Sequence, residues 1–164
     1  MFLKFKKPSA QKQKFNHHFI FIEAPADLVG PEVILWGEAL WWPKNSSMKF
    51  IRLTHGEIQV GTKYSQKVLL PLAPEWEVEV TRLLPGKEIE RTFLNGMFKG
   101  KEIVRIEERY NGTKVEYAMH YEVLGILNQI LWQLFFRKMH DWNIKMILKA
   151  LQDYVTNKQK TEMP

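Results

Sequence analysis

The segment from Gly125 to about Val155 constrains the fold more than any other part of the chain. After Gly125 it contains neither Gly nor Pro, and its Leu, Ile, Met, Phe and Trp residues recur at helical spacing. An uninterrupted apolar period near 3.6 residues predicts one long helix. Such a helix needs an apolar surface to cover, so the rest of the chain must supply one.

The apolar residues of this predicted helix do not share one face. On a helical wheel the early ones favour one face and the later ones nearly the opposite face, and the change comes at residues 137–141. A helix with two apolar faces must either bend or contact two different apolar surroundings. The early set is Leu127, Ile130, Leu131, Leu134 and Phe135, and the later set is Met139, Met146, Ile147, Ala150, Leu151 and Tyr154.

With 164 residues, the chain is long enough for one domain with a substantial core. We expect this domain at residues 14–156, between a basic tail at 1–13 and a C-terminal tail at 157–164. No stretch reaches the roughly 20 apolar residues that a membrane span needs, and residues 1–8 lack the apolar core of a signal peptide. Cysteine is absent. We therefore expect an unexported, cytoplasmic protein.

The net charge of +6 is concentrated at one end of the chain. The first fourteen residues contain no acidic residue and hold Lys4, Lys6, Lys7, Lys12 and Lys14, so the remainder is nearly neutral. A basic tail beside a neutral body is typical of solubility or of weak attraction to anionic surfaces. We therefore do not expect a nucleic-acid partner.

Alternating apolar and polar residues predict a series of strands after a short helical region. Residues 23–27 end the first strand, and two short helices are expected between there and residue 40, with Pro31 in the first turn of the second. The last four strands are joined by Pro85-Gly86, Asn95-Gly96 and Asn111-Gly112, which predict short turns and an antiparallel meander. A bulge is expected at Gly100. The predicted strands are 14–22, 48–55, 61–70, 76–84, 88–94, 98–110 and 113–123.

This order of elements resembles the helix-grip fold of the SRPBCC or START-like superfamily. That superfamily includes the START lipid-transfer domains, the birch-pollen allergen proteins and the polyketide cyclase/dehydrase group. The residues that carry the resemblance are Ala24-Pro25-Ala26-Asp27-Leu28-Val29, Trp41-Trp42-Pro43, Val60-Gly61-Thr62, Leu84-Pro85-Gly86 and Asn111-Gly112-Thr113-Lys114-Val115.

The resemblance implies an α+β fold in which a curved, seven-stranded antiparallel sheet wraps around the long C-terminal helix, with two short helices after the first strand. It also implies an apolar cavity between sheet and helix that holds a lipid, a polyketide or another hydrophobic small molecule. The same scaffold serves carriers, receptors and enzymes, so the fold alone does not decide function.

Strand alternation selects the residues that would line this cavity. The last hairpin's tyrosines and methionine are expected to face the terminal helix across empty space. The alternative is that all these side chains simply fill the core. The candidate ligand-binding residues are Tyr64, Gln66, Trp76, Val78, Arg82, Arg91, Phe93, Tyr117, Met119, Tyr121 and Leu131.

Arg82 and Arg91 are the most informative candidates. Both fall on the apolar phase of their strands, where an unpaired guanidinium is costly, so each needs a carboxylate or an anionic ligand group. Glu108, in phase with Val104 and Ile106, is the expected carboxylate. A structural ion pair and a ligand anchor both remain open. A one-residue register shift would turn either arginine to solvent.

Other chemistry has little support in the sequence. His140 and Asp141 are neighbours on a helix and point about 100° apart, so they do not form a catalytic pair with each other. The alternatives are that one of them faces the cavity or, as we expect, that the histidine is capped or exposed. Isolated histidines such as His55 and His120 give no metal-binding motif. No serine lies in a Gly-x-Ser-x-Gly setting and no Gly-rich phosphate loop occurs. We predict no metal and no cofactor.

The sequence leaves three functional hypotheses. The first is a non-catalytic binder or carrier of a hydrophobic small molecule. The second is an enzyme of the polyketide cyclase/dehydratase type, in which Arg82, Arg91 and Tyr or His groups polarise a carbonyl and move protons. The third is a membrane-associated accessory protein with transient membrane contact.

Several apolar segments exceed what a small core readily absorbs. Burial against the cavity is the default, but an exposed part would form a homodimer face, a membrane-docking lip or the cavity mouth. The segments are Trp36 with Trp41-Trp42, Leu69-Leu70-Pro71-Leu72, and residues 126–136.

Overall fold

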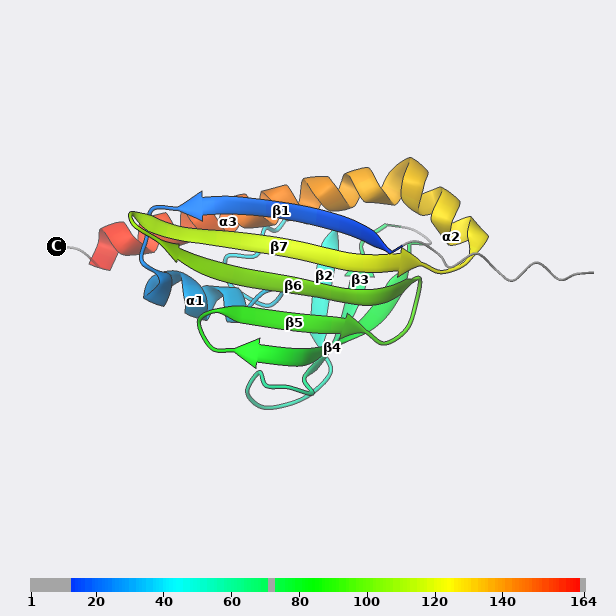
Figure 1. The fold of residues 1–164 in the computed structure, drawn as a ribbon, viewed down its shortest axis with the longest axis horizontal. Helices are drawn as coiled ribbons and strands as arrows, with labels where there is room; N and C mark the ends of the chain where they lie inside the picture. Colours follow the sequence, from blue (N-terminus) through cyan, green and yellow to red (C-terminus); the bar gives the residue numbers. More distant parts are fainter. Residues whose placement is uncertain (1–12, 71–72, 163–164) are drawn as a thin grey trace, which may run out of the picture.

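A computed structural model describes residues 13–70 and 73–162. Its centre is a seven-stranded antiparallel sheet with the strand order β1-β7-β6-β5-β4-β3-β2. In Figure 1, β2 and β3 stand steeply behind the other strands, so the sheet is strongly curved. The strands are β1 (Lys14–Ile22), β2 (Met48–Arg52), β3 (Lys63–Val68), β4 (Glu75–Leu84), β5 (Glu88–Phe93), β6 (Phe98–Arg109) and β7 (Gly112–Val123).

The sheet confirms the predicted meander of the last four strands, β4 to β7, in which every consecutive pair is antiparallel. The antiparallel pairing continues to β3 and β2. The first strand pairs with the last along its whole length, from Lys14↔Tyr121 to Ile22↔Thr113. Most of the predicted basic tail, residues 1–12, and part of the predicted apolar segment 69–72 lie outside the described residues.

One short helix follows β1, not the two that were predicted. α1 (Ala26–Ile34) continues through Gly30 and Pro31, which the sequence suggested as a break. Proline fixes a φ compatible with a helix, and Gly30 lies so close to Gly86 that a Cβ would meet its Cα at 2.7 Å. Both residues therefore belong to one helix packed on the β4–β5 turn.

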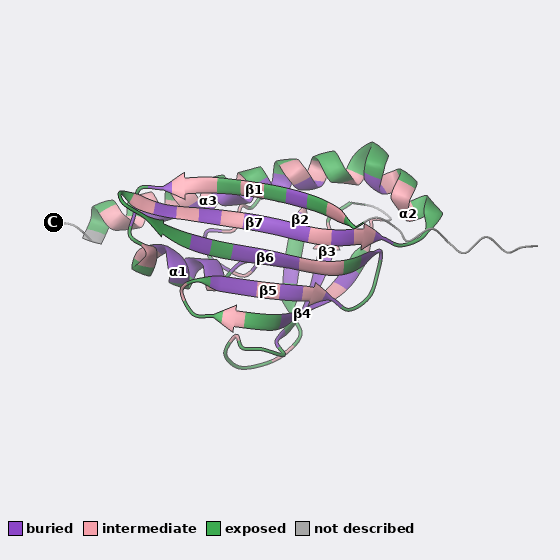
Figure 2. Cartoon of the chain, viewed as in Figure 1, coloured by how far each residue is buried: buried purple, intermediate pink, exposed green. Residues whose placement is uncertain are grey.

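The long C-terminal helix is present and has three parts. They are α2 (Ile126–Leu131), the π-helical segment η1 (Trp132–Phe136) and α3 (Arg137–Glu162), so the helix continues past Val155. The buried stripe of α3 includes Ile147 and Leu151, whereas α2 has no buried residue. Figure 2 shows this contrast along the helix. Within the described residues, no helix is long and apolar enough to span a membrane.

The two predicted helix faces therefore have different surroundings. The later face packs against the sheet, and the early face is largely exposed, with Leu127, Leu134 and Phe135 all open to solvent. The π-helical segment lies beside the point where the pattern changes. One extra residue in a turn rotates the rest of the helix about its axis, and a π-bulge is one known way for a helix to change the direction in which its side chains point.

The inward orientation predicted for Arg82 is wrong, and the reason is a β-bulge. The β4–β5 register shifts between Val80, which pairs with Arg91, and Arg82, which pairs with Glu90. The extra residue moves the following side chains to the other face. Arg82 is thus 57% exposed and forms an ion pair with Glu88 at 3.3 Å. The bulge expected at Gly100 is absent, because the β6–β7 pairing runs through it without a shift.

Arg91 lies inside the sheet as predicted, and it is fully buried. Its Nη1 lies 3.4 Å from Oε1 of Glu102, and its Nη2 donates a hydrogen bond to the carbonyl oxygen of Trp36 at 3.1 Å. The guanidinium also lies over the Tyr64 ring, 5.2 Å from its centroid. The partner predicted from the sequence, Glu108, is exposed instead. Glu102 has the same strand phase but is located deeper in the sheet.

Loss of either member of this buried pair should be strongly destabilising. Arg91→Met or Glu102→Gln should each lower the free energy of unfolding by about 3–5 kcal/mol, because the remaining charge or its partners stay buried without compensation. The double variant should cost clearly less than the sum of the two. Urea unfolding monitored by tryptophan fluorescence measures all three.

The exposed arginine provides the matched control. Arg82→Met removes the same side chain from an exposed position, where the buried Glu88 keeps its ion pair with Arg105 at 2.6 Å, and should change stability by no more than about 1 kcal/mol. Two results would contradict a coupled buried pair. One is an equal loss in the free energy of unfolding for Arg82→Met and Arg91→Met, and the other is strictly additive losses for the Arg91 and Glu102 variants.

Candidate functional site

Aromatic side chains occupy the space that was expected to be empty. Tyr117 stacks on Trp36, with ring centroids 6.0 Å apart and planes 16° apart. Tyr121 contacts Trp132 edge-on at 5.3 Å, and the indole of Trp132 donates a hydrogen bond to the Tyr121 hydroxyl. The prediction that the last hairpin faces an open cavity is therefore wrong for this structure. The filling residues are Trp36, from the chain after α1, and Trp132, from η1.

Most of the predicted site residues do lie on the interior face. Arg82 is the exception, and Leu131 is half-buried, since the neighbouring Trp132 is the helix residue that closes on β7. The buried members of the predicted set are Tyr64, Gln66, Trp76, Val78, Arg91, Phe93, Tyr117, Met119 and Tyr121.

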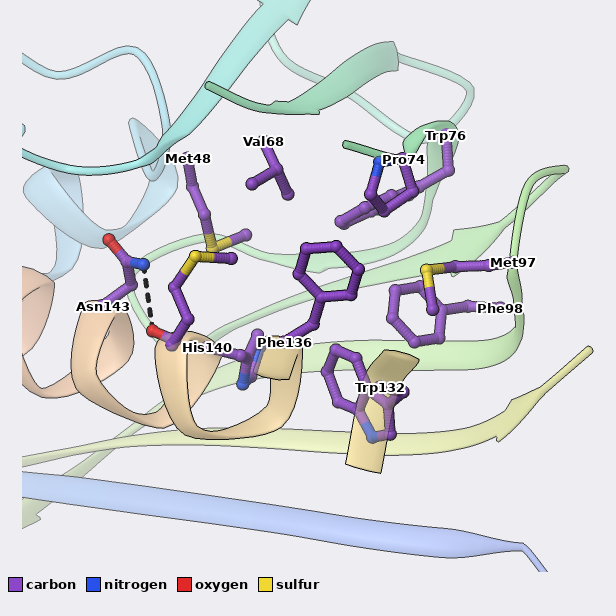
Figure 3. Close-up of a pocket in the computed structure, with 11 residues that line it drawn as sticks. Met48, Val68, Pro74, Trp76, Met97, Phe98, Trp132, Phe136, His140 and Asn143 are labelled. Carbon is purple, nitrogen blue, oxygen red and sulfur yellow. Dashed lines mark hydrogen bonds between the residues drawn. The ribbon is translucent and has the colours of Figure 1, made fainter. Parts of the chain in front are cut away.

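A small apolar cavity remains between the start of α3 and the curled end of the sheet. Its volume is about 10 Å³, which is the room that roughly one water molecule needs. Figure 3 shows side chains from the sheet and its turns on one side of the cavity and from the helix on the other. The lining residues are Met48, Val68, Pro74, Trp76, Met97, Phe98, Trp132, Phe136, Met139, His140 and Asn143.

Of the predicted ligand-binding residues, Trp76 alone is among these lining residues. Most of the others that line the cavity come from β2, the β5–β6 turn, η1 and α3, and no strand alternation points to them. Three are methionines, whose unbranched and polarisable side chains fill irregular gaps and adapt to different neighbours. Met48 and Met97 are nearly fully buried, as expected for such gap-filling residues.

A chain of buried polar groups leads from the ion pair to the cavity. Glu102 accepts hydrogen bonds from Gln66 Nε2 at 2.8 Å and from the Tyr117 hydroxyl at 3.4 Å. That hydroxyl lies 3.2 Å from Nε2 of His140, which lines the cavity. The expectation of a capped or exposed histidine is therefore wrong, because His140 is 6% exposed.

The electrostatics of this chain favour a neutral tyrosine. Burial raises the pKa of Tyr117 well above its ordinary value, and the nearby carboxylate of Glu102 raises it further. On the other side of the imidazole, Nδ1 of His140 is buried and has no hydrogen-bond partner within the described part of the chain. His140 thus has one ring nitrogen beside the Tyr117 hydroxyl and the other without a hydrogen bond to any described residue, 3.9 Å from Oδ1 of Asp141, and the surface of the cavity that it lines is apolar.

Asn143 fixes the helix to the loop before β2, and it also lines the cavity. Its Oδ1 accepts a hydrogen bond from the backbone N–H of Ser47, and its Nδ2 donates to the Ser47 hydroxyl and to the carbonyl oxygen of Met139. Figure 3 shows one hydrogen bond of Asn143 within the cavity lining as a dashed line. The side chain is fully buried, so its amide is held in one orientation.

Asp141 joins α3 to the edge strand β1. Its Oδ1 accepts hydrogen bonds from Asn16 and His18, and it lies 3.9 Å from Nδ1 of His140. Three neighbours hold the pKa of Asp141 well below its usual value. His140 has the largest effect, and Asn16 and His18 add to it. Burial lowers the pKa of His18, although Asp141 partly opposes that shift.

This cluster predicts a loss of stability in mild acid. The folded-state pKa of His18 lies below the unfolded value of 6.5, so the unfolded state takes up the proton first. The free energy of unfolding should therefore fall as the pH decreases through 6.5. The variant His18→Gln retains a hydrogen-bond donor for Asp141 but cannot titrate. Its free energy of unfolding, measured with urea, should fall less between about pH 7.5 and 5.5 than that of the parent protein.

The exposed loop histidine His55 is the control for that measurement. His55→Gln should follow the parent protein over the whole range. If His18→Gln has the same pH dependence as the parent, the buried histidine does not carry the effect.

Comparison with known proteins identifies the fold. No family model matches the sequence, and no curated protein matches it. Solved structures match closely in shape. The Zhui aromatase/cyclase from Streptomyces sp. R1128 has a TM-score of 0.69 and 15% identity, covering 90% of this chain and 96% of its own.

Two further structures have the same architecture. Norcoclaurine synthase from Thalictrum flavum, in complex with dopamine and hydroxybenzaldehyde, has a TM-score of 0.67 and 13% identity, covering 96% of each chain. A START superfamily protein from Mycobacterium smegmatis has a TM-score of 0.61 and 14% identity, covering 87% of this chain and 97% of its own. At such identities the likeness concerns the fold alone. The predicted helix-grip, START-like fold is thereby confirmed as the fold of this chain.

Proposed function

We propose that this protein binds a hydrophobic small molecule in the cavity between the curled end of the sheet and the η1–α3 junction. The observation that carries the proposal is a buried, methionine-rich apolar cavity with two polar side chains on its wall, His140 and Asn143. Ligand sites in proteins commonly combine an apolar lining with a few placed polar groups.

The cavity must enlarge to admit a ligand, and one of its walls is weakly held. α2 contributes no buried residue, and in η1 Trp132 is the buried one. Segments with few buried apolar contacts open locally at a small free-energy cost. Movement of Phe136 with that segment would join the cavity to solvent, and the flexible methionines that line the cavity would adjust to the ligand.

The neighbours in structure are consistent with this proposal. Norcoclaurine synthase holds two aromatic small molecules, dopamine and hydroxybenzaldehyde, in the same fold, and the Zhui protein is an aromatase/cyclase. The compounds that the cavity takes up will decide whether the natural ligand here is a lipid, a polyketide or another aromatic compound.

Ligand uptake should be blocked when the cavity is filled. The neutral probe N-phenyl-1-naphthylamine should bind the full-length protein, with enhanced probe fluorescence and quenching of Trp76 and Trp132. Val68→Trp places a larger side chain at the cavity wall and should weaken binding by about tenfold or more. Val60→Trp makes the same change at an exposed loop position and should leave binding unchanged.

Native mass spectrometry of the protein purified from its host provides the second measurement, and an apolar compound should be recovered. Failure of the probe to bind, together with an empty mass spectrum, would overturn the proposal. Equal loss of probe binding in the Val68 and Val60 variants would place the probe outside the cavity.

The second candidate function is catalysis of the cyclase/dehydratase type in the same cavity. The observation that favours it is the Glu102–Tyr117–His140 chain, which links a buried carboxylate to an imidazole on the cavity wall. Such a chain can hold a proton donor beside a carbonyl of the bound molecule. Binding alone does not require it.

The compound recovered by native mass spectrometry distinguishes these candidates. If the protein is an enzyme, incubation should change the mass or ring pattern of that compound, and Tyr117→Phe or His140→Gln should abolish the change while probe binding persists. If it is a carrier, the compound should be returned unchanged by the parent protein and by both variants.

A further inference from the structure

The outer face of α2 and η1 is an exposed apolar stripe. Ile126, Leu127, Ile130, Leu134 and Phe135 are between 49% and 78% exposed. Successive members are one, three or four residues apart, which places them on one broad side of the helix. A soluble protein rarely leaves such a contiguous apolar surface uncovered without an interaction to serve.

Besides the stripe, an exposed apolar pair at the end of β3 lies beside the cavity of the proposed ligand site. Val68 and Phe136 both line the cavity, and Leu69 and Leu70, which come directly after Val68, are 57% and 48% exposed. The cavity wall is thus flanked by apolar surface from the helix and from the end of β3.

The segment that carries this stripe has basic but no acidic side chains. From residue 123 to residue 140 there is no acidic side chain, and Arg137 and Lys138 come directly after the stripe. Both are exposed and form no ion pair with any described residue. Lys14 and Arg137 line one groove, and the sequence before Lys14 adds four more lysines and no acid.

We propose that the α2–η1 face docks on an anionic membrane surface. An apolar helical stripe with a cationic fringe is the arrangement that inserts shallowly between lipid headgroups. Each basic side chain near an anionic leaflet adds electrostatic attraction. A second copy of the chain fits less well, because the same positive charges would face each other across the contact. Docking does not depend on what the cavity binds.

The position of the stripe connects docking with the cavity. Trp132 and Phe136 line the cavity from η1, whose opposite side carries Leu134 and Phe135. Insertion of the outer side into headgroups therefore acts on the same segment that closes the cavity. This step rests on the proposed function, whereas docking itself does not.

Vesicle co-sedimentation of the full chain tests the docking. The protein should sediment with phosphatidylcholine vesicles that contain phosphatidylserine, and much less with phosphatidylcholine alone. Leu127→Glu/Phe135→Glu should reduce binding to the anionic vesicles by about tenfold or more. Arg137→Gln/Lys138→Gln should reduce binding to anionic vesicles and make the remainder less sensitive to salt.

The control variant is Leu40→Glu/Tyr110→Glu. Both residues are fully exposed, and Tyr110 lies at the end of β7 farthest from α2, so the charge change is identical but the stripe is intact. This variant should bind vesicles almost as the parent does. Circular dichroism confirms that each variant is folded, and N-phenyl-1-naphthylamine binding without vesicles tests the cavity separately.

Three outcomes would overturn the proposal. The first is equal loss of vesicle binding in the stripe variant and the control variant. The second is complete loss on deletion of residues 1–12 with no effect of the stripe variant, which would assign membrane attraction to the lysines alone. The third is a parent dimer that becomes monomeric in Leu127→Glu/Phe135→Glu without any vesicle binding, which would assign the stripe to a second copy of the chain.

Discussion

The structure depends on how the curved sheet is covered by the C-terminal helix. α3 supplies one continuous apolar stripe that includes Ile144, Ile147, Leu151 and Val155, all nearly inaccessible to solvent. Each such side chain contributes about 1.5–3 kcal/mol when it is fully buried. α2 supplies no buried residue to this contact. The helix is therefore firmly packed at one end and loosely held at the other, and the cavity lies where the packing changes.

The interior combines this apolar contact with a connected polar chain. Arg91 and Glu102 are almost fully desolvated, and hydrogen bonds with Gln66, Tyr117 and the carbonyl oxygen of Trp36 offset part of the cost. Among the described residues, Nε of Arg91 has no hydrogen-bond partner. In a low-dielectric interior such a network holds its members in one arrangement. It also connects the buried carboxylate, through Tyr117, to the imidazole of His140. A polar chain that ends at an apolar cavity suits both ligand orientation and proton transfer.

The same helix segment is central to both proposals. Its inner side carries Trp132 and Phe136 at the cavity, and its outer side carries the exposed apolar stripe. A segment with two apolar sides is stable in water only while one side is covered, and exposure of the other leaves a surface suited to lipid. The two-faced pattern that stands out in the sequence thus has a direct physical meaning in the fold.

The sequence by itself determined the parts of the fold that depend on local periodicity and on turn chemistry. These are the meander joined at residues 85–86, 95–96 and 111–112, the long helix with its two faces, and the inward position of Arg91. Alternation along a strand decides which side chains face the same side, and three-to-four spacing decides the same for a helix.

Only the tertiary structure decided which residues meet. The bulge before Arg82, the choice of Glu102 over Glu108, the burial of His140 and the filling of the interior by Trp36 and Trp132 were not predictable from periodicity. Each depends on the volume left between elements distant in sequence. Close packing makes that volume a property of all the side chains around it, so no local pattern encodes it.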